Sequence, residues 1–157
     1  MKKLIIIIPA YNEEKTIGDT LDGLLSIKVK LSELGYELFI HVINDGSTDS
    51  TEEFVKRYPE VLVINHEKNK GLGAAVRTGL LSAENISADI VVKYDADLQH
   101  VPQDILDLIK PIHNNEADVV YGNRFQRMNY KMPFVRKIGN KVFTRLMKWL
   151  TGWPLLD

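Results

Sequence analysis

The sequence predicts an α/β protein with a mostly parallel β-sheet that helices cover on both faces. Short apolar runs alternate along the chain with longer segments of helical periodicity, which is the order of strands and helices in a parallel sheet. The apolar runs are continuous rather than interrupted at every second residue, as expected of strands buried on both sides. A polar motif follows each run, at the end of the strand where ligands bind in such sheets.

The elements follow one another in a regular order. We expect strands at residues 3–8, 38–43, 61–64, 90–94 and 118–121, with helices between them at 14–33, 49–58, 71–84 and 102–115. A last helix is expected at 133–150, because apolar residues recur there at three- and four-residue steps.

The composition is that of one soluble domain. The chain has 157 residues, of which 45% are hydrophobic and 26% charged, and this length is enough to bury a core. The absence of cysteine excludes disulfides and thiolate chemistry and favours a reducing compartment. The start, MKKLIIIIPAYNEE, imitates a signal peptide, but its apolar stretch at 4–8 is short and Pro9 follows at once, so we interpret it as the first strand.

The charge is distributed unevenly, although the net charge is only −1. Residues 1–118 contain 12 basic and 20 acidic residues, whereas residues 119–157 contain eight basic residues and one acid, Asp157. The C-terminal segment is therefore expected to meet an anionic partner. Nucleic acid is not that partner in our interpretation, because the basic residues share their helix with an apolar face and the rest of the chain is acidic.

The motif YDADLQH, residues 94–100, carries the most chemistry. Asp95 and Asp97 are two residues apart at the end of an apolar run, so their side chains point the same way on an extended strand. Two carboxylates there suit Mg²⁺ or Mn²⁺ that also binds substrate phosphate, and Gln99 and His100 are further candidate ligands. The alternative is a turn or helix cap, since Pro102 opens the next helix.

Two further motifs follow the first and second strands. Asp45, in NDGSTD, is placed to accept a hydrogen bond from a ring N–H of uracil or guanine, while the same motif also has the residues of a turn and helix cap. In PAYNEE, Pro9 and Ala10 close the first strand, Tyr11 is a candidate to stack on a base, and Glu13 lies in the first turn of a helix, where a carboxylate is favourable in any case.

Basic residues lie at two places where a phosphate is expected. Lys70 precedes the glycines of NKGLGAAVR, which open a helix without forming a dinucleotide-binding or phosphate-binding glycine loop. Arg124 ends the expected fifth strand, and Arg136 lies in the basic C-terminal helix; arginine matches phosphate geometry, so both are candidates to bind a phosphate-bearing acceptor. The helix at 133–150 also has the pattern of a segment that contacts a membrane surface.

Together, IIIIPAYNEE, VINDGSTDST, NKGLGAAVRTG, YDADLQH and VVYGNRF resemble family 2 glycosyltransferases of the GT-A fold. Within that family the chain is most similar to dolichol-phosphate mannose synthases and other polyprenyl-phosphate glycosyltransferases. The resemblance covers essentially the whole chain and implies one GT-A domain, a three-layer sandwich, with its nucleotide-sugar part at 1–124 and an acceptor and membrane segment at 125–157. Such enzymes continue past this point with a TGFRAF-like segment and often with membrane helices, which this chain lacks, so we expect a C-terminal truncation.

The resemblance implies roles for individual residues. Nucleotide-sugar contacts fall on Pro9, Ala10, Tyr11, Glu13, Asp45, Lys70, Asp95, Ala96 and Asp97. The implied metal ligands are Asp95, Asp97 and Gln99, and the residues implied in catalysis are Asp95 and Asp97 together with Arg124 and Arg136, which hold the lipid phosphate.

The implied reaction is metal-dependent, inverting transfer of a sugar from a GDP- or UDP-sugar to a polyprenyl phosphate. The expected cofactor is Mg²⁺ or Mn²⁺, and the expected place is the cytoplasmic face of a membrane, with a membrane-anchoring partner or a further C-terminal region. Two alternatives remain: a family 2 enzyme that glycosylates a sugar hydroxyl in polysaccharide or glycoprotein synthesis, and a nucleotide-sugar-binding module without activity.

Overall fold

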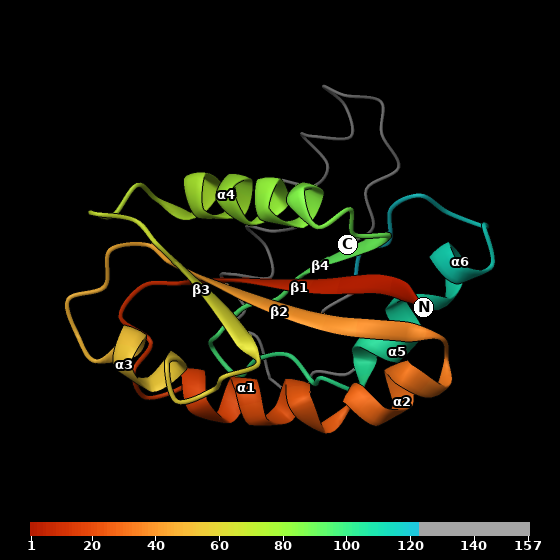
Figure 1. Ribbon diagram of the computed structural model, residues 1–157, viewed down its shortest axis with the longest axis horizontal. Helices are drawn as coiled ribbons and strands as arrows, with labels where there is room; N and C mark the ends of the chain where they lie inside the picture. Colours follow the sequence, from red (N-terminus) through yellow and green to blue (C-terminus); the bar gives the residue numbers. More distant parts are fainter. Residues whose placement is uncertain (123–157) are drawn as a thin grey trace, which may run out of the picture. The chain divides into compact units, whose positions relative to one another are not determined.

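A computed structural model describes residues 1–122, and its centre is a sheet of four parallel strands (Figure 1). The strands are β1 (Lys2–Ala10), β2 (Tyr36–Asn44), β3 (Val61–Asn65) and β4 (Ile90–Lys93), in the spatial order β3-β2-β1-β4. All three pairings are parallel. The predicted parallel sheet and four of its strands are confirmed.

Strand β1 lies in the middle because it is apolar on both faces. Leu4, Ile6 and Ile8 face one core, and Ile5 and Ile7 face the other; all five are fully buried. Successive side chains of a strand point to opposite faces, so an uninterrupted apolar run requires cover on both sides.

The helices provide that cover in two layers (Figure 1). On one face lie α1 (Ile17–Ser26), α2 (Lys28–Glu33), α3 (Thr51–Val55) and α5 (Asp104–Leu108), followed by the short α6 (Lys110–His113). On the other face α4 (Leu72–Asn85) lies alone among the described helices. The three-layer arrangement agrees with the predicted fold.

Helix α4 approaches the sheet closely because its inner face is small. Ala75, Gly79 and Ala83 are buried there. A Cβ added at Gly79 would lie 3.0 Å from side-chain atoms of Ile7 and Ile43, so larger residues would push the helix outward.

Two predicted helices are each divided in the structure. The helix predicted at 14–33 is α1 and α2, which meet at Ile27, whose N–H donates to the Leu24 carbonyl in a tighter three-residue turn at 3.3 Å. The helix predicted at 102–115 is α5 and α6, because Pro111 has no N–H to continue the helical ladder. The helix predicted at 49–58 is shorter, as α3.

The strand predicted at 118–121 is wrong. These residues form no strand in the described part of the chain, and Val119 and Tyr121 are 65% and 89% exposed. An apolar run forms a strand only where a neighbouring strand pairs with it, and pairing is a property of the tertiary structure rather than of local propensity. The helix predicted at 133–150 lies outside the described residues.

Candidate functional site

A cavity of about 290 Å³ opens at the carboxyl ends of β1, β2 and β4, next to the start of α4. It is lined by Pro9, Ala10, Tyr11, Glu13, Asp45, Asn69, Gly71, Leu72, Ala75, Asp95, Ala96 and Asp97. Eight of the nine residues predicted to contact a nucleotide sugar therefore share one cavity. Lys70 is not among the lining residues, but both of its neighbours are. Parallel strands explain this convergence, because their carboxyl ends meet at one edge of the sheet.

The loop after β1 is tied to the loop after β2. The Asn12 N–H donates to Ser47 Oγ at 3.0 Å, and the Thr48 N–H donates back to Asn12 Oδ1 at 2.8 Å. The Glu13 N–H donates to Thr51 Oγ1 at 2.8 Å. These bonds hold the segment that carries Tyr11, a residue that remains 46% exposed and lines the cavity.

Asp49 and Glu14 reinforce the same junction. Asp49 accepts the Glu14 N–H at 3.1 Å, and Glu14 accepts the Ser50 N–H at the same distance. Asp49 also accepts the N–H of Thr51, the first residue of α3, at 3.0 Å. Burial raises the pKa of Asp49, but a hydrogen bond from the Thr51 hydroxyl at 2.5 Å, together with these backbone bonds, outweighs burial and lowers the pKa below its usual range. The N-cap of α3 is Ser50, which forms no side-chain cap bond, and Asp49 instead accepts the first helical N–H from the turn before it.

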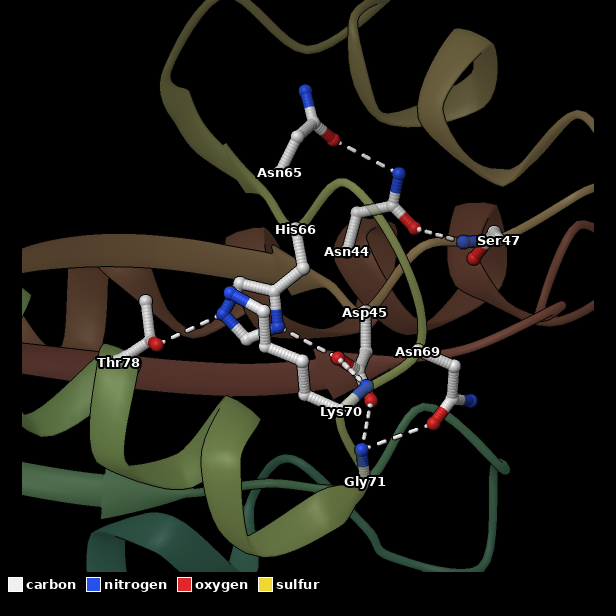
Figure 2. Close-up of polar contacts among 9 residues, drawn as sticks. All are labelled: Asn44, Asp45, Ser47, Asn65, His66, Asn69, Lys70, Gly71 and Thr78. Atoms are coloured by element: carbon white, nitrogen blue, oxygen red, sulfur yellow. Dashed lines mark hydrogen bonds and ion pairs between the residues drawn. The ribbon is translucent and has the colours of Figure 1, made fainter.

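Asp45 accepts three hydrogen bonds at the edge of the cavity (Figure 2). Its Oδ1 accepts His66 Nδ1–H at 2.6 Å and the Lys70 N–H at 3.0 Å, and its Oδ2 accepts the Gly71 N–H at 2.8 Å. Burial raises its pKa, but the bonds from His66 and from the two backbone amides outweigh burial and lower it. The carboxylate thus fastens the loop between β3 and α4 beside the cavity.

His66 is a residue of the site that sequence reasoning missed. Its side chain is almost fully buried between Asp45 and Thr78 on α4, and Nε2 lies 2.9 Å from Thr78 Oγ1 (Figure 2). The signal was its position directly after β3, where the other strands also end in polar motifs. The register places Asn44 opposite Asn65, so Asp45 and His66 leave their strands side by side.

Asn44 holds the turn that begins the loop after β2. Its Oδ1 accepts the Ser47 N–H at 3.0 Å, and its Nδ2 donates to Asn65 Oδ1 at 2.8 Å, which joins the ends of β2 and β3 (Figure 2). Gly46 in the same turn has a φ of +71°, and a Cβ there would lie 2.5 Å from the backbone of Lys68. Only glycine fits this conformation and this approach without strain.

The two carboxylates after β4 have different surroundings. Asp95 is partly buried; its Oδ1 accepts a hydrogen bond from Lys93 Nζ, and His100 Nε2 lies 3.4 Å from its Oδ2. Burial raises the pKa of Asp95, but the interactions with Lys93 and His100 outweigh it and lower the pKa. Asp97 is exposed and accepts the Gln99 N–H at 3.1 Å, which is the turn contact of the alternative interpretation.

Tyr94 anchors the segment that carries both carboxylates. Its ring is buried, and its hydroxyl donates to the His100 carbonyl at 2.7 Å. Burial, with smaller contributions from Asp104 and Asp97, raises the pKa of Tyr94 to about 12. The hydroxyl therefore stays protonated and holds the loop closed at neutral pH.

The donor set suits a hard divalent cation that brings ligands of its own. Asp95 and Asp97 both line the cavity and offer carboxylate oxygens. Within residues 1–122 no group of three or more His, Cys, Asp or Glu residues surrounds one point, so phosphate or water oxygens would complete the shell. The side chain of Gln99 is exposed and does not line the cavity. Arg124 and Arg136 lie outside the described residues.

Comparison with known proteins identifies the family. The profile of glycosyl transferase family 2 matches residues 5–154, nearly the whole chain. The chain belongs to glycosyl transferase family 2. The resemblance seen in the motifs is confirmed, and so is membership of a family of enzymes.

Relatives of this family 2 chain include polyprenyl-phosphate enzymes. It is 36% identical to the UDP-N-acetylglucosamine–dolichyl-phosphate N-acetylglucosaminyltransferase of Methanococcus voltae, over 99% of this chain and 66% of that protein. It is 39% identical to the dolichol-phosphate mannosyltransferase of Pyrococcus furiosus, over 88% of this chain and 38% of that protein. The chain thus spans less than two thirds of the length of either relative.

The solved structure of another glycosyltransferase supports the GT-A fold. The mannosyltransferase PcManGT of Pyrobaculum calidifontis, in complex with GDP-Man and Mn²⁺, superposes with a TM-score of 0.51 at 28% identity, over 60% of this chain and 27% of that one. Among the helices described for this family 2 chain, none has the length and apolar character needed to cross a membrane.

Proposed function

We propose that the protein is a metal-dependent, inverting glycosyltransferase that moves a sugar from a GDP- or UDP-sugar to a polyprenyl phosphate. The observation that carries the proposal is the single cavity that joins Tyr11, Asp45, Asp95 and Asp97 at one edge of the sheet. The names of the relatives support the acceptor class, since both act on a dolichyl phosphate.

The nucleotide would lie along the ends of β1 and β2. The exposed ring of Tyr11 is available to stack on a base. Asp45 already accepts three hydrogen bonds, and a carboxylate has about four lone-pair sites, so it retains capacity for one base N–H. We therefore assign Asp45 two tasks: it holds the loop at 66–71, and it offers its remaining site to the base. Pro9, Ala10, Glu13 and Ala96 shape the cavity walls, and Lys70 carries a positive charge beside them.

Asp95 and Asp97 would hold a divalent cation beside the donor diphosphate, with Gln99 as a further ligand if its exposed side chain turns inward. A bound cation of this kind supplies Lewis-acid stabilisation of the charge that develops on the leaving nucleoside diphosphate. The protein provides two oxygen donors on one short segment, and Tyr94 keeps that segment in place.

In the transfer step, an oxygen of the acceptor phosphate attacks the anomeric carbon of the sugar. The new carbon–oxygen bond forms as the bond to the donor diphosphate breaks, and the electron pair leaves with the diphosphate. Attack from the opposite side inverts the anomeric centre. The phosphate oxygen is already anionic at neutral pH, so the step needs no dedicated general base. Arg124 and Arg136 are proposed to hold this phosphate, and the basic segment around them to meet the membrane surface at its cytoplasmic side.

Calorimetric titration of the chain tests the donor half of the proposal. UDP, GDP and their common sugar adducts are titrated with Mn²⁺ and again with EDTA, and one nucleotide is expected to bind only with the metal. Asp97→Ala should lose the binding that depends on metal, whereas Glu33→Ala, at the exposed end of α2 near the opposite edge of the sheet, should keep it. Nucleotide binding by Asp97→Ala that keeps both the affinity and the metal dependence of the wild type would contradict the metal role.

Transfer assays on the full-length protein test the acceptor half. A radiolabelled donor sugar is offered with dolichyl phosphate, and in parallel with oligosaccharide acceptors that present only hydroxyl groups. Label in the lipid fraction supports the proposal. Label only in the oligosaccharides indicates an enzyme of polysaccharide or glycoprotein synthesis, and donor binding without transfer to either acceptor indicates a binding module.

A further inference from the structure

Lys93 has a place in the site that the proposed reaction does not use. It is the last residue of β4 and pairs with Ile7 of β1, so its side chain lies on the same sheet face as Ile7, the face that α4 covers. Asp95 follows two residues later, and Lys93 Nζ donates to Asp95 Oδ1. A positive charge of the chain itself thus rests on a carboxylate of the cavity.

Both oxygens of Asp95 have partners in this arrangement. Lys93 Nζ contacts Oδ1, and His100 Nε2 lies 3.4 Å from Oδ2. Asp97, the other carboxylate after β4, forms no ion pair with a residue of the described chain, and its recorded bond is from the Gln99 backbone. The two carboxylates are therefore unequal: a cation that reaches Asp97 meets an exposed group, and a cation that reaches Asp95 must compete with Lys93.

The ion pair is weak enough to be displaced. The side chains of Lys93 and Asp95 are 37% and 22% exposed, so water and salt reach the pair and screen it. The flexible stem of lysine can carry its ammonium group away from Asp95 without moving β4. A divalent cation has twice the charge of the ammonium group and no side-chain entropy to lose, so it can take the place of Lys93 on Oδ1.

We propose that Lys93 is a built-in competitor for the divalent cation: it neutralises Asp95 in the metal-free protein, and it sets how tightly the cation binds. The inference rests on the metal role proposed for Asp95 and Asp97. It assigns Lys93 to the control of metal affinity rather than to the chemistry of transfer. The cavity then binds metal less tightly than its two carboxylates alone would allow.

The test is direct binding of Mn²⁺ to the chain, measured by the electron paramagnetic resonance signal of free Mn²⁺, without nucleotide. Lys93→Met keeps the apolar stem and removes the charge, and we expect its Kd for Mn²⁺ to be about three- to tenfold lower than that of the wild type. Lys93→Arg keeps a positive charge and should bind Mn²⁺ about as the wild type does. Lys110→Met, which breaks the exposed pair between Lys110 and Asp107, is the control and should leave the Kd unchanged.

The outcomes separate this inference from the proposed function. Suppose that the wild type binds Mn²⁺ and that Asp97→Ala abolishes this binding. Unchanged or weaker Mn²⁺ binding by Lys93→Met would then refute the competitor role and leave the metal site standing. If neither the wild type nor Lys93→Met binds Mn²⁺ without nucleotide, no competition takes place and the inference fails, while the titrations with nucleotide and Mn²⁺ decide the metal site separately. Tighter binding by Lys110→Met as well would mean that net charge alone sets the affinity, which also refutes a specific role for Lys93.

Discussion

The replacement of Asp45 by asparagine tests the central interaction of the site. Asp45 is 3% exposed, and its carboxylate accepts hydrogen bonds from His66 Nδ1 and from the backbone amides of Lys70 and Gly71. An asparagine has nearly the same shape but presents one oxygen and one NH₂ group. The NH₂ group cannot accept a hydrogen bond, so at least one of the three donors must face another donor.

The size of the effect follows from this change. A hydrogen bond to a charged group contributes about 1.5–3 kcal/mol, and a buried donor left without an acceptor costs about 1–3 kcal/mol. The loop at 67–70 is exposed, so water can reach part of the released amides and reduce the cost. We therefore expect Asp45→Asn to lower the free energy of unfolding by about 2–3 kcal/mol, which at a slope of about 2 kcal/mol/M moves the urea midpoint by about 1–1.5 M.

Urea unfolding followed by circular dichroism measures this difference. Glu60→Gln serves as the control, because Glu60 forms an exposed ion pair with Lys28 and its loss should change stability by less than about 1 kcal/mol. A midpoint for Asp45→Asn that is the same as that of Glu60→Gln would refute the role of the carboxylate as organiser of the loop.

The pH dependence supplies a second check on Asp45. Its pKa is lower in the folded protein than in the unfolded chain, so the folded state gains stability from the ionised carboxylate above the unfolded pKa of about 3.9. That gain is lost as the pH falls through the lower, folded pKa. The stability gap between the wild type and Asp45→Asn should therefore be full near neutral pH and narrow below about pH 4. A gap that does not change with pH would show that the lost hydrogen-bond acceptor, and not the charge of Asp45, accounts for the difference in stability.

Three further predictions concern single positions. Gly46→Ala should lower the free energy of unfolding by about 2–4 kcal/mol, because φ is +71° and a Cβ would lie 2.5 Å from the backbone of the facing loop. Gly73→Ala, in the open first turn of α4, should be neutral or stabilising by up to about 1 kcal/mol. Thermal unfolding of the two variants compares them. Burial lowers the pKa of His41, so the unfolded chain takes up a proton more readily and the free energy of unfolding falls as the pH drops below about 6.5. In urea titrations between about pH 7 and pH 5, the free energy of unfolding of His41→Gln should change less with pH than that of the wild type. The same change with pH in both proteins would contradict the role of His41. Tyr36→Phe removes the 2.7 Å contact between the buried hydroxyl and His113 Nδ1 and should lower the free energy of unfolding by about 1 kcal/mol. Amide hydrogen exchange in α6 should become faster, and a wild-type exchange rate there would mean that the contact does not hold the helix.

Much of the fold was open to prediction from the sequence because its signals are local. The run at 4–8 is apolar at every position, and only a strand covered on both faces buries all of it. The errors came where local signals do not decide. The apolar run at 118–121 has the composition of a strand but no strand pairs with it in the described chain, and Pro111 and Ile27 divide helices that periodicity alone joins.

The candidate site shows the same division. Most of its lining residues were predicted, because each follows a strand and parallel strands bring those ends together. His66 was not predicted, since a single histidine after a short strand has no pattern of its own. The turn contact of Asp97 was one of two alternatives that the sequence left open, and only the structure shows it. The ion pair of Asp95 with Lys93 was not predicted, because it depends on which rotamer each side chain adopts.

The sequence by itself determined the type of sheet, the order of its elements and the edge at which polar side chains gather, because these depend on apolar periodicity and on the direction of the chain. The tertiary structure decided which of those side chains bond to one another. The pairing of β2 with β3 sets Asn44 opposite Asn65, and from that register Asp45 reaches His66 and the amides of Lys70 and Gly71, just before α4. A shift of the register by one residue would turn His66 to the other face of the sheet. Such long-range alignment depends on packing across the whole core, and no short stretch of sequence contains it.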